Sequence, residues 1–115
     1  MIKRFVPKKT HSILAVQWDG KIDTLSDIEA ITGKCTVEMK QEGFNTKGFR
    51  FADNVNYLVE YDDKKMLYVA TSYGLFCCNI GDYVASIYNK EKDDMLSSVI
   101  REHVFEETYK PYINE

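Results

Sequence analysis

Residues 57–88 read YLVEYDDKKMLYVATSYGLFCCNIGDYVASIY and decide the fold. Short runs of aromatic, β-branched and aliphatic residues alternate with polar turn sequences, a pattern typical of strands joined by tight connections. Because the connections are only a few residues long, consecutive strands should pair in antiparallel fashion as a meander. The expected strands are 57–61, 66–71, 75–78 and 83–88.

The sequence before this run adds a further strand and a helix. Residues 12–18, SILAVQW, are rich in strand formers and end at an Asp-Gly turn, so they predict a strand. Residues 25–32, LSDIEAIT, place apolar side chains three positions apart and predict a short helix with one apolar face. Thr24 is expected to cap its start, and Gly33 stands where a helix C-terminal glycine belongs.

The other segments are less regular. The sequence is compatible with strands at 35–40 and 96–101, and the charged segment 89–95 is expected to be a mobile excursion. Residues 42–56 predict a long loop with a short strand at 48–51. The end, EHVFEETYKPY, fits either a helical turn or a strand. The sequence therefore predicts an α+β fold: a single antiparallel β-meander sheet, open or curled toward a partial barrel, with one short helix.

The length of the chain indicates one domain, and its charged residues are unevenly distributed along the sequence. The 115 residues, 44% of them hydrophobic, are enough for one core, so 1–115 is predicted as a single domain. Residues 1–10 carry four basic residues and no acid, which predicts a basic arm at a mobile terminus. The rest of the chain has 11 basic and 18 acidic residues, a balance of −7. An acidic body does not favour direct binding to nucleic acid.

The cysteines indicate a reducing compartment. Three cysteines, of which Cys77 and Cys78 are adjacent, make a poor disulfide framework. Neighbours on a strand face opposite sides, so one of this pair should face the core. The start, MIKRFVPKK, lacks a signal-peptide apolar stretch, and no run is long enough to span a bilayer. A cytoplasmic protein without membrane association is expected.

No motif predicts catalysis or a metal site. The cysteines Cys35, Cys77 and Cys78 and the histidines His11 and His103 lack the spacing of zinc ligands. A cysteine–histidine catalytic pair has no flanking signature here, and nucleophile-elbow, P-loop and dinucleotide-binding motifs are absent from the sequence. We therefore expect no enzyme activity and no cofactor.

Three short blocks of the sequence occur in a recognisable order: Gln17, Trp18 and Gly20, then Gly81, Asp82, Tyr83 and Val84, then Phe105, Glu106, Thr108 and Tyr109. In their order and spacing they resemble the V-Q-[WF]-x-G, G-D-[YW]-[IV] and F-E-x-T-Y blocks of a family of small, mostly uncharacterised proteins of tailed phages and prophages. The resemblance implies a phage origin and an early or accessory role, and it supplies no activity. A longer charged stretch at 89–103 and an enlarged middle at 34–56 depart from the family pattern.

The matched positions also have a structural interpretation. A Gly-Asp pair suits a turn before a strand, because glycine accepts positive φ and aspartate bonds its own backbone. Trp18, Tyr83 and Tyr109 would most simply form one aromatic core cluster.

These observations favour a non-catalytic phage accessory protein that acts by binding. The leading hypothesis is an inhibitor of a host defence system, similar to anti-CRISPR proteins, that binds a host protein. Its candidate contact residues are an aromatic side chain and three nearby acids, since aromatic anchors and acidic surfaces suit interfaces. These residues are Trp18, Asp19, Asp23 and Asp27.

Two alternatives stay open, and a homodimer is compatible with each. The first is a sponge for a nucleotide signal, with an aromatic pocket and a basic residue for phosphate. Lys34, Lys47 and Arg50 are the candidates for that role. The second alternative is a minor structural component of the virion.

Overall fold

The structure is a computed structural model of the chain, which describes residues 2–7, 13–41, 54–61, 64–89 and 94–111. These residues form nine strands and two α-helices. The strands divide into a five-stranded and a four-stranded sheet. The α+β prediction is thus confirmed, and the predictions of a single sheet and of one helix are wrong.

The first sheet is antiparallel throughout and has the order β8-β7-β2-β1-β9. Lys3–Pro7, expected in a mobile basic arm, instead forms an inner strand of this sheet, because Phe5 is buried and the backbone pairs on both sides. Residues 8–10 of the arm lie outside the described ranges. The strands are β1 (Lys3–Pro7), β2 (Ile13–Gln17), β7 (Tyr83–Asn89), β8 (Asp94–Ile100) and β9 (Tyr109–Pro111).

The second sheet has the order β3-β4-β5-β6, in which β3 and β4 are parallel and the other pairs antiparallel. Its strands are β3 (Thr36–Gln41), β4 (Asn56–Tyr61), β5 (Lys64–Thr71) and β6 (Gly74–Cys78). The predicted strands 57–61, 66–71 and 75–78 are confirmed here. The predicted short strand at 48–51 lies outside the described residues, as do positions 90–93 of the charged excursion.

The meander breaks at the connection between β6 and β7. Here the Trp18 N–H donates to Asp82 O at 2.9 Å, and the Gly81 N–H donates to Trp18 O at 2.7 Å. These bonds attach the start of β7 to the end of β2, so the chain leaves the second sheet and enters the first. A local turn sequence does not reveal this change of partner, which is why the single-sheet prediction failed.

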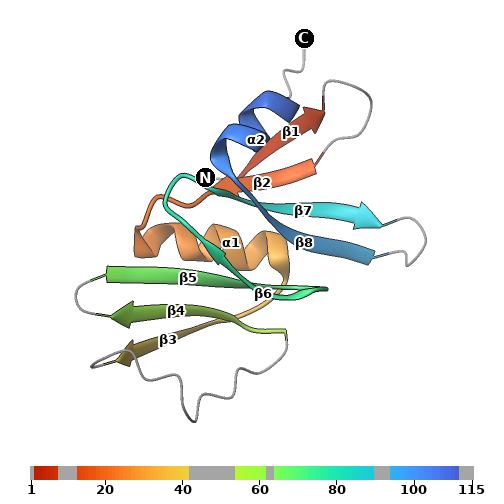
Figure 1. Cartoon of the computed structure of the whole chain (residues 1–115). Helices are drawn as coiled ribbons and strands as arrows, with labels where there is room; N and C mark the ends of the chain where they lie inside the picture. The colour runs from red at the N-terminus through yellow and green to blue at the C-terminus, as the bar shows by residue number, and fades with distance from the viewer. Residues whose placement is uncertain (1, 8–12, 42–53, 62–63, 90–93, 112–115) are drawn as a thin grey trace.

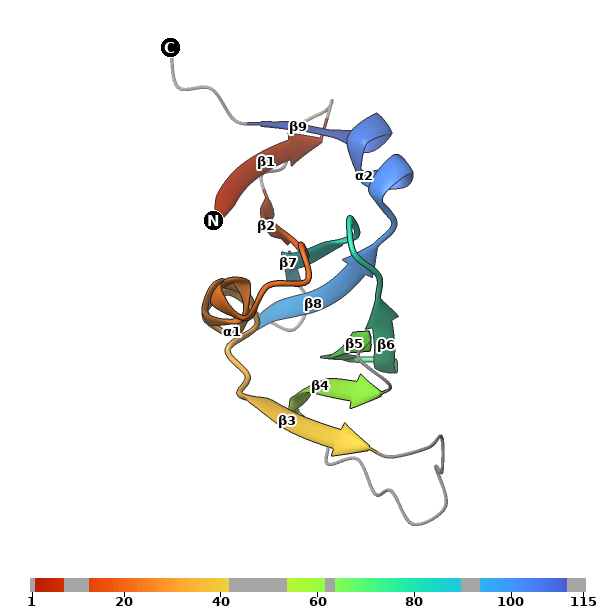
Figure 2. The same ribbon diagram turned by 90° about the vertical axis from the view of Figure 1, so that its left-hand side faces the viewer.

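Helix α1 (Leu25–Thr32) follows a short 3₁₀ turn, η1 (Ile22–Thr24), and lies between the two sheets (Figures 1 and 2). Its predicted apolar face is buried between them. The core it joins takes side chains from both sheets, so burial of this face holds the sheets together. The core consists of Val16, Trp18, Leu25, Ile28, Ile31, Leu58, Leu67, Val69, Cys78 and Val84.

A smaller core lies on the other face of the first sheet, beneath helix α2 (Glu102–Thr108). The ring of Phe105 stacks on Tyr83 with a centroid distance of 3.8 Å, and on Tyr109 at 4.8 Å. Trp18 belongs to the other core, so the expected single cluster of Trp18, Tyr83 and Tyr109 is wrong. Adjacent strand residues face opposite sides, which separates the aromatic residues into two layers.

The cap predicted from the sequence at the C-terminal end of α1 is confirmed, and the cap predicted at its N-terminal end is wrong. Gly33 adopts φ 68° and donates its N–H to Glu29 O at 2.9 Å, as expected for a C-terminal glycine. Thr24 does not cap the helix, because its own backbone is helical and its hydroxyl donates to Asp19 Oδ1 at 2.7 Å.

A buried amide joins β4 to its neighbours. The Asn56 side chain is fully buried, donates to Thr32 Oγ1 at 3.2 Å and accepts from the Ala70 N–H at 3.0 Å. Such a bridge is needed because a buried backbone N–H without an acceptor is costly.

Replacing Asn56 should therefore destabilise the fold strongly. We expect Asn56→Ala to lower the free energy of unfolding by about 2–3 kcal/mol, because the Ala70 N–H loses its acceptor and a cavity opens. Thr36→Val is the control, since the Thr36 hydroxyl is buried without a partner among described residues and its removal should be neutral or stabilising. Urea unfolding of both variants measures this, and equal losses in both would contradict the role of Asn56.

Candidate functional site

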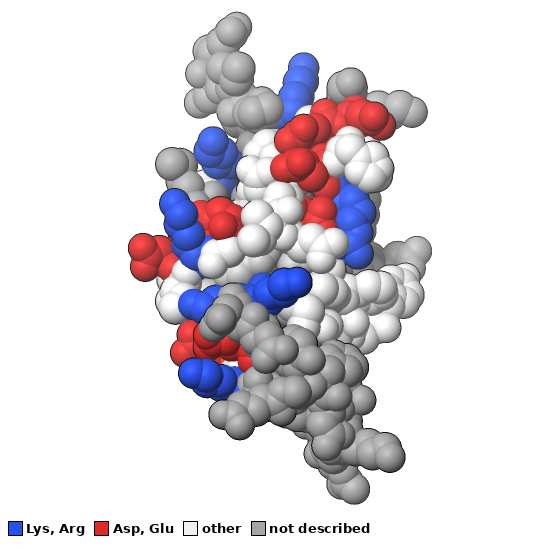
Figure 3. Space-filling view, turned by 60° about the vertical axis from the view of Figure 1, so that its left-hand side comes forward, with Lys and Arg blue, Asp and Glu red and all other residues white. Residues whose placement is uncertain are grey.

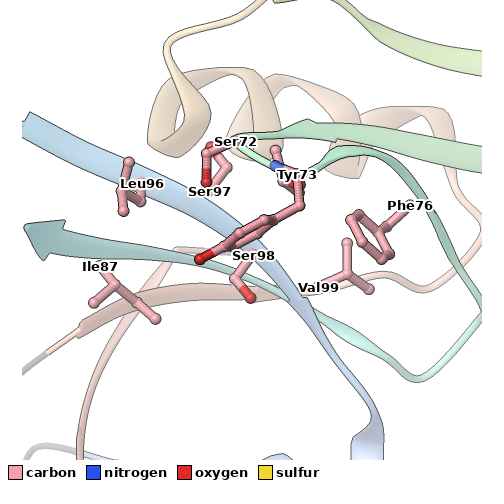
Figure 4. A pocket seen from close by; sticks show the side chains of 9 residues that line it. Ser72, Tyr73, Phe76, Ile87, Leu96, Ser97, Ser98 and Val99 are labelled. Carbon is pink, nitrogen blue, oxygen red and sulfur yellow. Dashed lines mark hydrogen bonds between the residues drawn. The ribbon is translucent and has the colours of Figure 1, made fainter.

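A pocket that combines apolar, aromatic and hydroxyl side chains lies where an edge of each sheet meets the other. Strand β8 forms one edge of the first sheet, and β6 forms one edge of the second. Strands β5 and β6 pack against β8, and the gap between them is a cavity of about 250 Å³. We call it the hairpin-tip pocket, because the β5–β6 turn forms one side (Figure 4). It is lined by Thr71, Ser72, Tyr73, Phe76, Ile87, Leu96, Ser97, Ser98 and Val99.

The β8 side of the pocket is made from both faces of that strand. Leu96 and Ser98 lie on one face, and Ser97 and Val99 on the other. Ile87 of β7 lies opposite Leu96 in the register and extends the apolar part. The pocket thus follows the edge of β8 and presents aliphatic side chains and hydroxyl groups together.

Two exposed aromatic side chains form the opposite side. Tyr73 is 90% exposed and Phe76 is 46% exposed. Figure 4 shows the Tyr73 ring reaching from the β5–β6 turn across the pocket, with its hydroxyl end toward β7 and β8. The turn itself is held by Thr71, whose Oγ1 accepts from the Tyr73 N–H at 3.1 Å and donates to Gly74 O at 2.9 Å. A fixed turn therefore carries an aromatic ring that packs little against the protein.

A lysine ammonium group lies behind the pocket wall. Lys34 follows the C-terminal glycine of α1 and is half-buried. Its Nζ donates to Ala70 O at 2.8 Å and to Ser97 Oγ at 3.5 Å. Ser97 also lines the pocket, so the positive charge lies one hydrogen bond away from the pocket wall.

The structure separates the residues predicted to contact a host protein. Trp18 is 1% exposed, so its ring packs in the core, and its Nε1–H has no partner among the described residues. Hydrogen bonds from the Thr24 hydroxyl and the Lys21 N–H lower the pKa of Asp19, whose carboxylate shapes the turn before α1.

The two remaining acids of that set differ in exposure. Asp23 is exposed and Asp27 is half-buried. A binding role for Asp19, Asp23 and Asp27 stays a prediction, but Trp18 is not on the surface beside them. Of the basic residues considered for phosphate, Lys34 adjoins the hairpin-tip pocket, whereas Lys47 and Arg50 lie outside the described ranges.

Residues of the Gly-Asp block have a structural role. The Asp82 carboxylate is buried and accepts from the backbone N–H groups of Asn79 and Glu102, both at 3.1 Å, and from the Arg101 guanidinium. The side chain of Gln17 donates to Gly81 O at 3.0 Å and to Glu102 Oε2 at 2.9 Å. These bonds join β2, the β6–β7 turn and the start of α2.

The exposed face of α2 is acidic. Figure 3 shows acidic side chains gathered at the end of the molecule where α2 lies, and the helix carries Glu102, Glu106 and Glu107. Burial raises the pKa of Tyr83 beneath this helix, and the carboxylates of Glu106 and Glu102 raise it further.

The thiols differ in accessibility. Cys35 is exposed, Cys77 is half-buried and Cys78 is buried, which confirms that one of the adjacent pair faces the core. Burial raises the pKa of Cys77, and it raises that of Cys78 to about 12. His103 is exposed on α2. Among the described residues, no group of three or more potential metal ligands comes together.

Comparisons with known proteins do not assign the chain to a class. No family model matches it, and neither the curated proteins nor the solved structures contain a significant match. In the described ranges, no helix has the length and apolarity needed to cross a bilayer.

The thiol environments predict an order of alkylation. We expect iodoacetamide at pH 8 to modify Cys35 first, Cys77 more slowly, and Cys78 only after unfolding, because a raised pKa leaves little thiolate. Mass spectrometry of the peptides at successive times measures this order. Modification of Cys78 in the folded protein as fast as Cys35 would contradict the burial described above.

Proposed function

We propose that the protein is a non-catalytic phage accessory protein that acts by binding in the bacterial cytoplasm, and that the hairpin-tip pocket is its ligand site. The phage accessory role is proposed from the resemblance of the three sequence blocks alone. The observation that carries the ligand site is the pair of exposed rings, Tyr73 and Phe76, beside a cavity of about 250 Å³. Exposed large aromatic side chains beside a cavity are typical of binding sites, because water contact with their rings is unfavourable until a ligand covers them.

The dimensions favour a small, flat ligand. Ligand pockets usually have volumes of roughly 300–1,000 Å³, so this cavity of about 250 Å³ suits a small ligand, no larger than a mononucleotide. Ile87, Leu96 and Val99 offer apolar contacts, and the rings of Tyr73 and Phe76 offer stacking surfaces. The serine hydroxyl groups supply hydrogen bonds to the edge of such a ring.

This proposal takes up the small-ligand alternative rather than capture of a host protein. A standard protein–protein interface buries roughly 800 Å² on each partner, and the residues that contribute most to binding near its centre are enriched in aromatic side chains. The expected anchor, Trp18, is already covered by the protein's own core. The hairpin-tip pocket, by contrast, has its aromatic residues on the outside.

The aromatic side chains should determine ligand affinity. We expect at least one of adenosine, guanosine, cytidine and uridine, or its 5′-monophosphate, to bind and to perturb the backbone amide NMR signals of Ser97 and Ser98. Removing one stacking ring by Tyr73→Ala or Phe76→Ala should weaken that binding about 5- to 150-fold, because stacking on an aromatic side chain contributes roughly 1–3 kcal/mol per base. Isothermal titration calorimetry measures the affinities.

Ile80→Ala is the matched control. Ile80 is an exposed apolar side chain, 70% accessible, and it lies outside the pocket. Its removal should leave affinity unchanged, while Tyr73→Phe should retain most of it because the ring persists. The proposal fails if no compound of the panel binds, or if the two ring deletions bind as well as the unmodified protein.

A further inference from the structure

We infer that the ligand of the hairpin-tip pocket is a nucleotide, with its phosphate recognised by Lys34 together with the hydroxyl groups of Ser97 and Ser72. This inference rests on the proposed function. The proposed function concerns a small ligand that stacks on aromatic rings, and the inference adds that this ligand carries a negative charge. It depends on three observations: an ammonium group with no carboxylate partner in the described part of the chain, hydroxyl groups beside it, and a set of pocket-lining residues without acids.

Among the described residues, the Lys34 ammonium group has no counter-ion. It is half-buried, yet no carboxylate of the described residues forms an ion pair with it. Its recorded acceptors are Ala70 O and Ser97 Oγ, both uncharged. An ammonium group has three donors, and a charge withdrawn from water is normally paired. An anion at this place would supply the missing pairing.

The hydroxyl groups extend the same site into the pocket. Ser97 Oγ is 3.5 Å from Lys34 Nζ and forms part of the wall. Ser72 also lines the pocket, and its hydroxyl makes no hydrogen bond to a described residue. Ser98 lies on the opposite face of β8 from Ser97 and is not part of this group. Phosphate oxygens accept several hydrogen bonds at once, so neighbouring hydroxyl donors beside a lysine match them. Figure 4 shows Ser72 and Ser97 at one end of the pocket.

Two electrostatic effects oppose the binding of a phosphate at this site, and each is weaker than the attraction by the Lys34 ammonium group. The carboxyl end of α1, just before Lys34, carries roughly half a negative charge, and this is less than the full charge of the ammonium group. The acidic body of the protein also repels anions, but solvent-exposed charges beyond about 8 Å are screened at physiological salt. None of the nine residues that line the pocket is acidic.

The experiment compares each nucleoside of the panel with its 5′-monophosphate by calorimetry. We expect the monophosphate to bind about 10- to 150-fold more tightly, the factor that corresponds to one hydrogen bond with a charged group. Lys34→Gln should remove most of that advantage while leaving nucleoside affinity unchanged, because glutamine can still donate to Ala70 O. Lys34→Arg should retain the advantage, and Lys64→Gln, an exposed lysine outside this pocket, should not alter it.

The possible results separate the two proposals. The inference is overturned if the monophosphate binds no more tightly than its nucleoside, or if its tighter binding persists in Lys34→Gln. Either result leaves the proposed function intact. Binding of neither compound overturns both. Titration of the unmodified protein at 50 and 500 mM KCl gives a second readout that needs no variant. The phosphate advantage should shrink with salt, and a salt-independent advantage also overturns the inference.

Discussion

The carboxylate of Asp82 connects the parts of the molecule on which the rest of the arrangement depends. It accepts hydrogen bonds from the N–H of Asn79, at the end of the second sheet, and from the N–H of Glu102, at the start of α2, and it pairs with Arg101. The backbone oxygen of the same residue accepts from Trp18 at the end of β2. One buried residue therefore fixes where the chain passes from one sheet to the other, and its backbone oxygen gives the N–H of the buried Trp18 an acceptor.

That passage has a geometric consequence for the site. Because β7 enters the first sheet instead of pairing with β6, each sheet keeps a free edge, and the edges formed by β6 and β8 come together. Sheet edges present unpaired backbone and irregular side-chain surfaces, so their meeting leaves a cavity more readily than the middle of a sheet does. The hairpin-tip pocket occupies this junction, with the β5–β6 turn supplying aromatic groups and β8 supplying hydroxyl groups.

The sequence indicated some features of the site and missed others. The predicted strands 66–71 and 75–78 place Tyr73 in the turn between them, but the sequence alone does not mark this side chain as a contact residue. Lys34, immediately after a helix-ending glycine, was a candidate for phosphate on charge alone. The sequence could not place these residues together, since they come from segments almost 40 positions apart. Trp18 was misinterpreted as a contact residue, because a tryptophan at a strand end suits a core and an interface equally well.

The amino-acid sequence by itself determined the elements: α1 at 25–32 with its C-terminal glycine, the strands of 57–88, and a core-facing cysteine in the adjacent pair. These features depend on side-chain periodicity and turn chemistry within a few residues, so local sequence is sufficient to predict them. Only the tertiary structure decided that there are two sheets, that β3 pairs with β4 in parallel, and that Lys34 lies behind the pocket. Strand pairing and pocket formation depend on hydrogen bonds and burial between segments that are distant in the sequence. The same local strand pattern is compatible with more than one such pairing, so the sequence of each segment does not determine its partner.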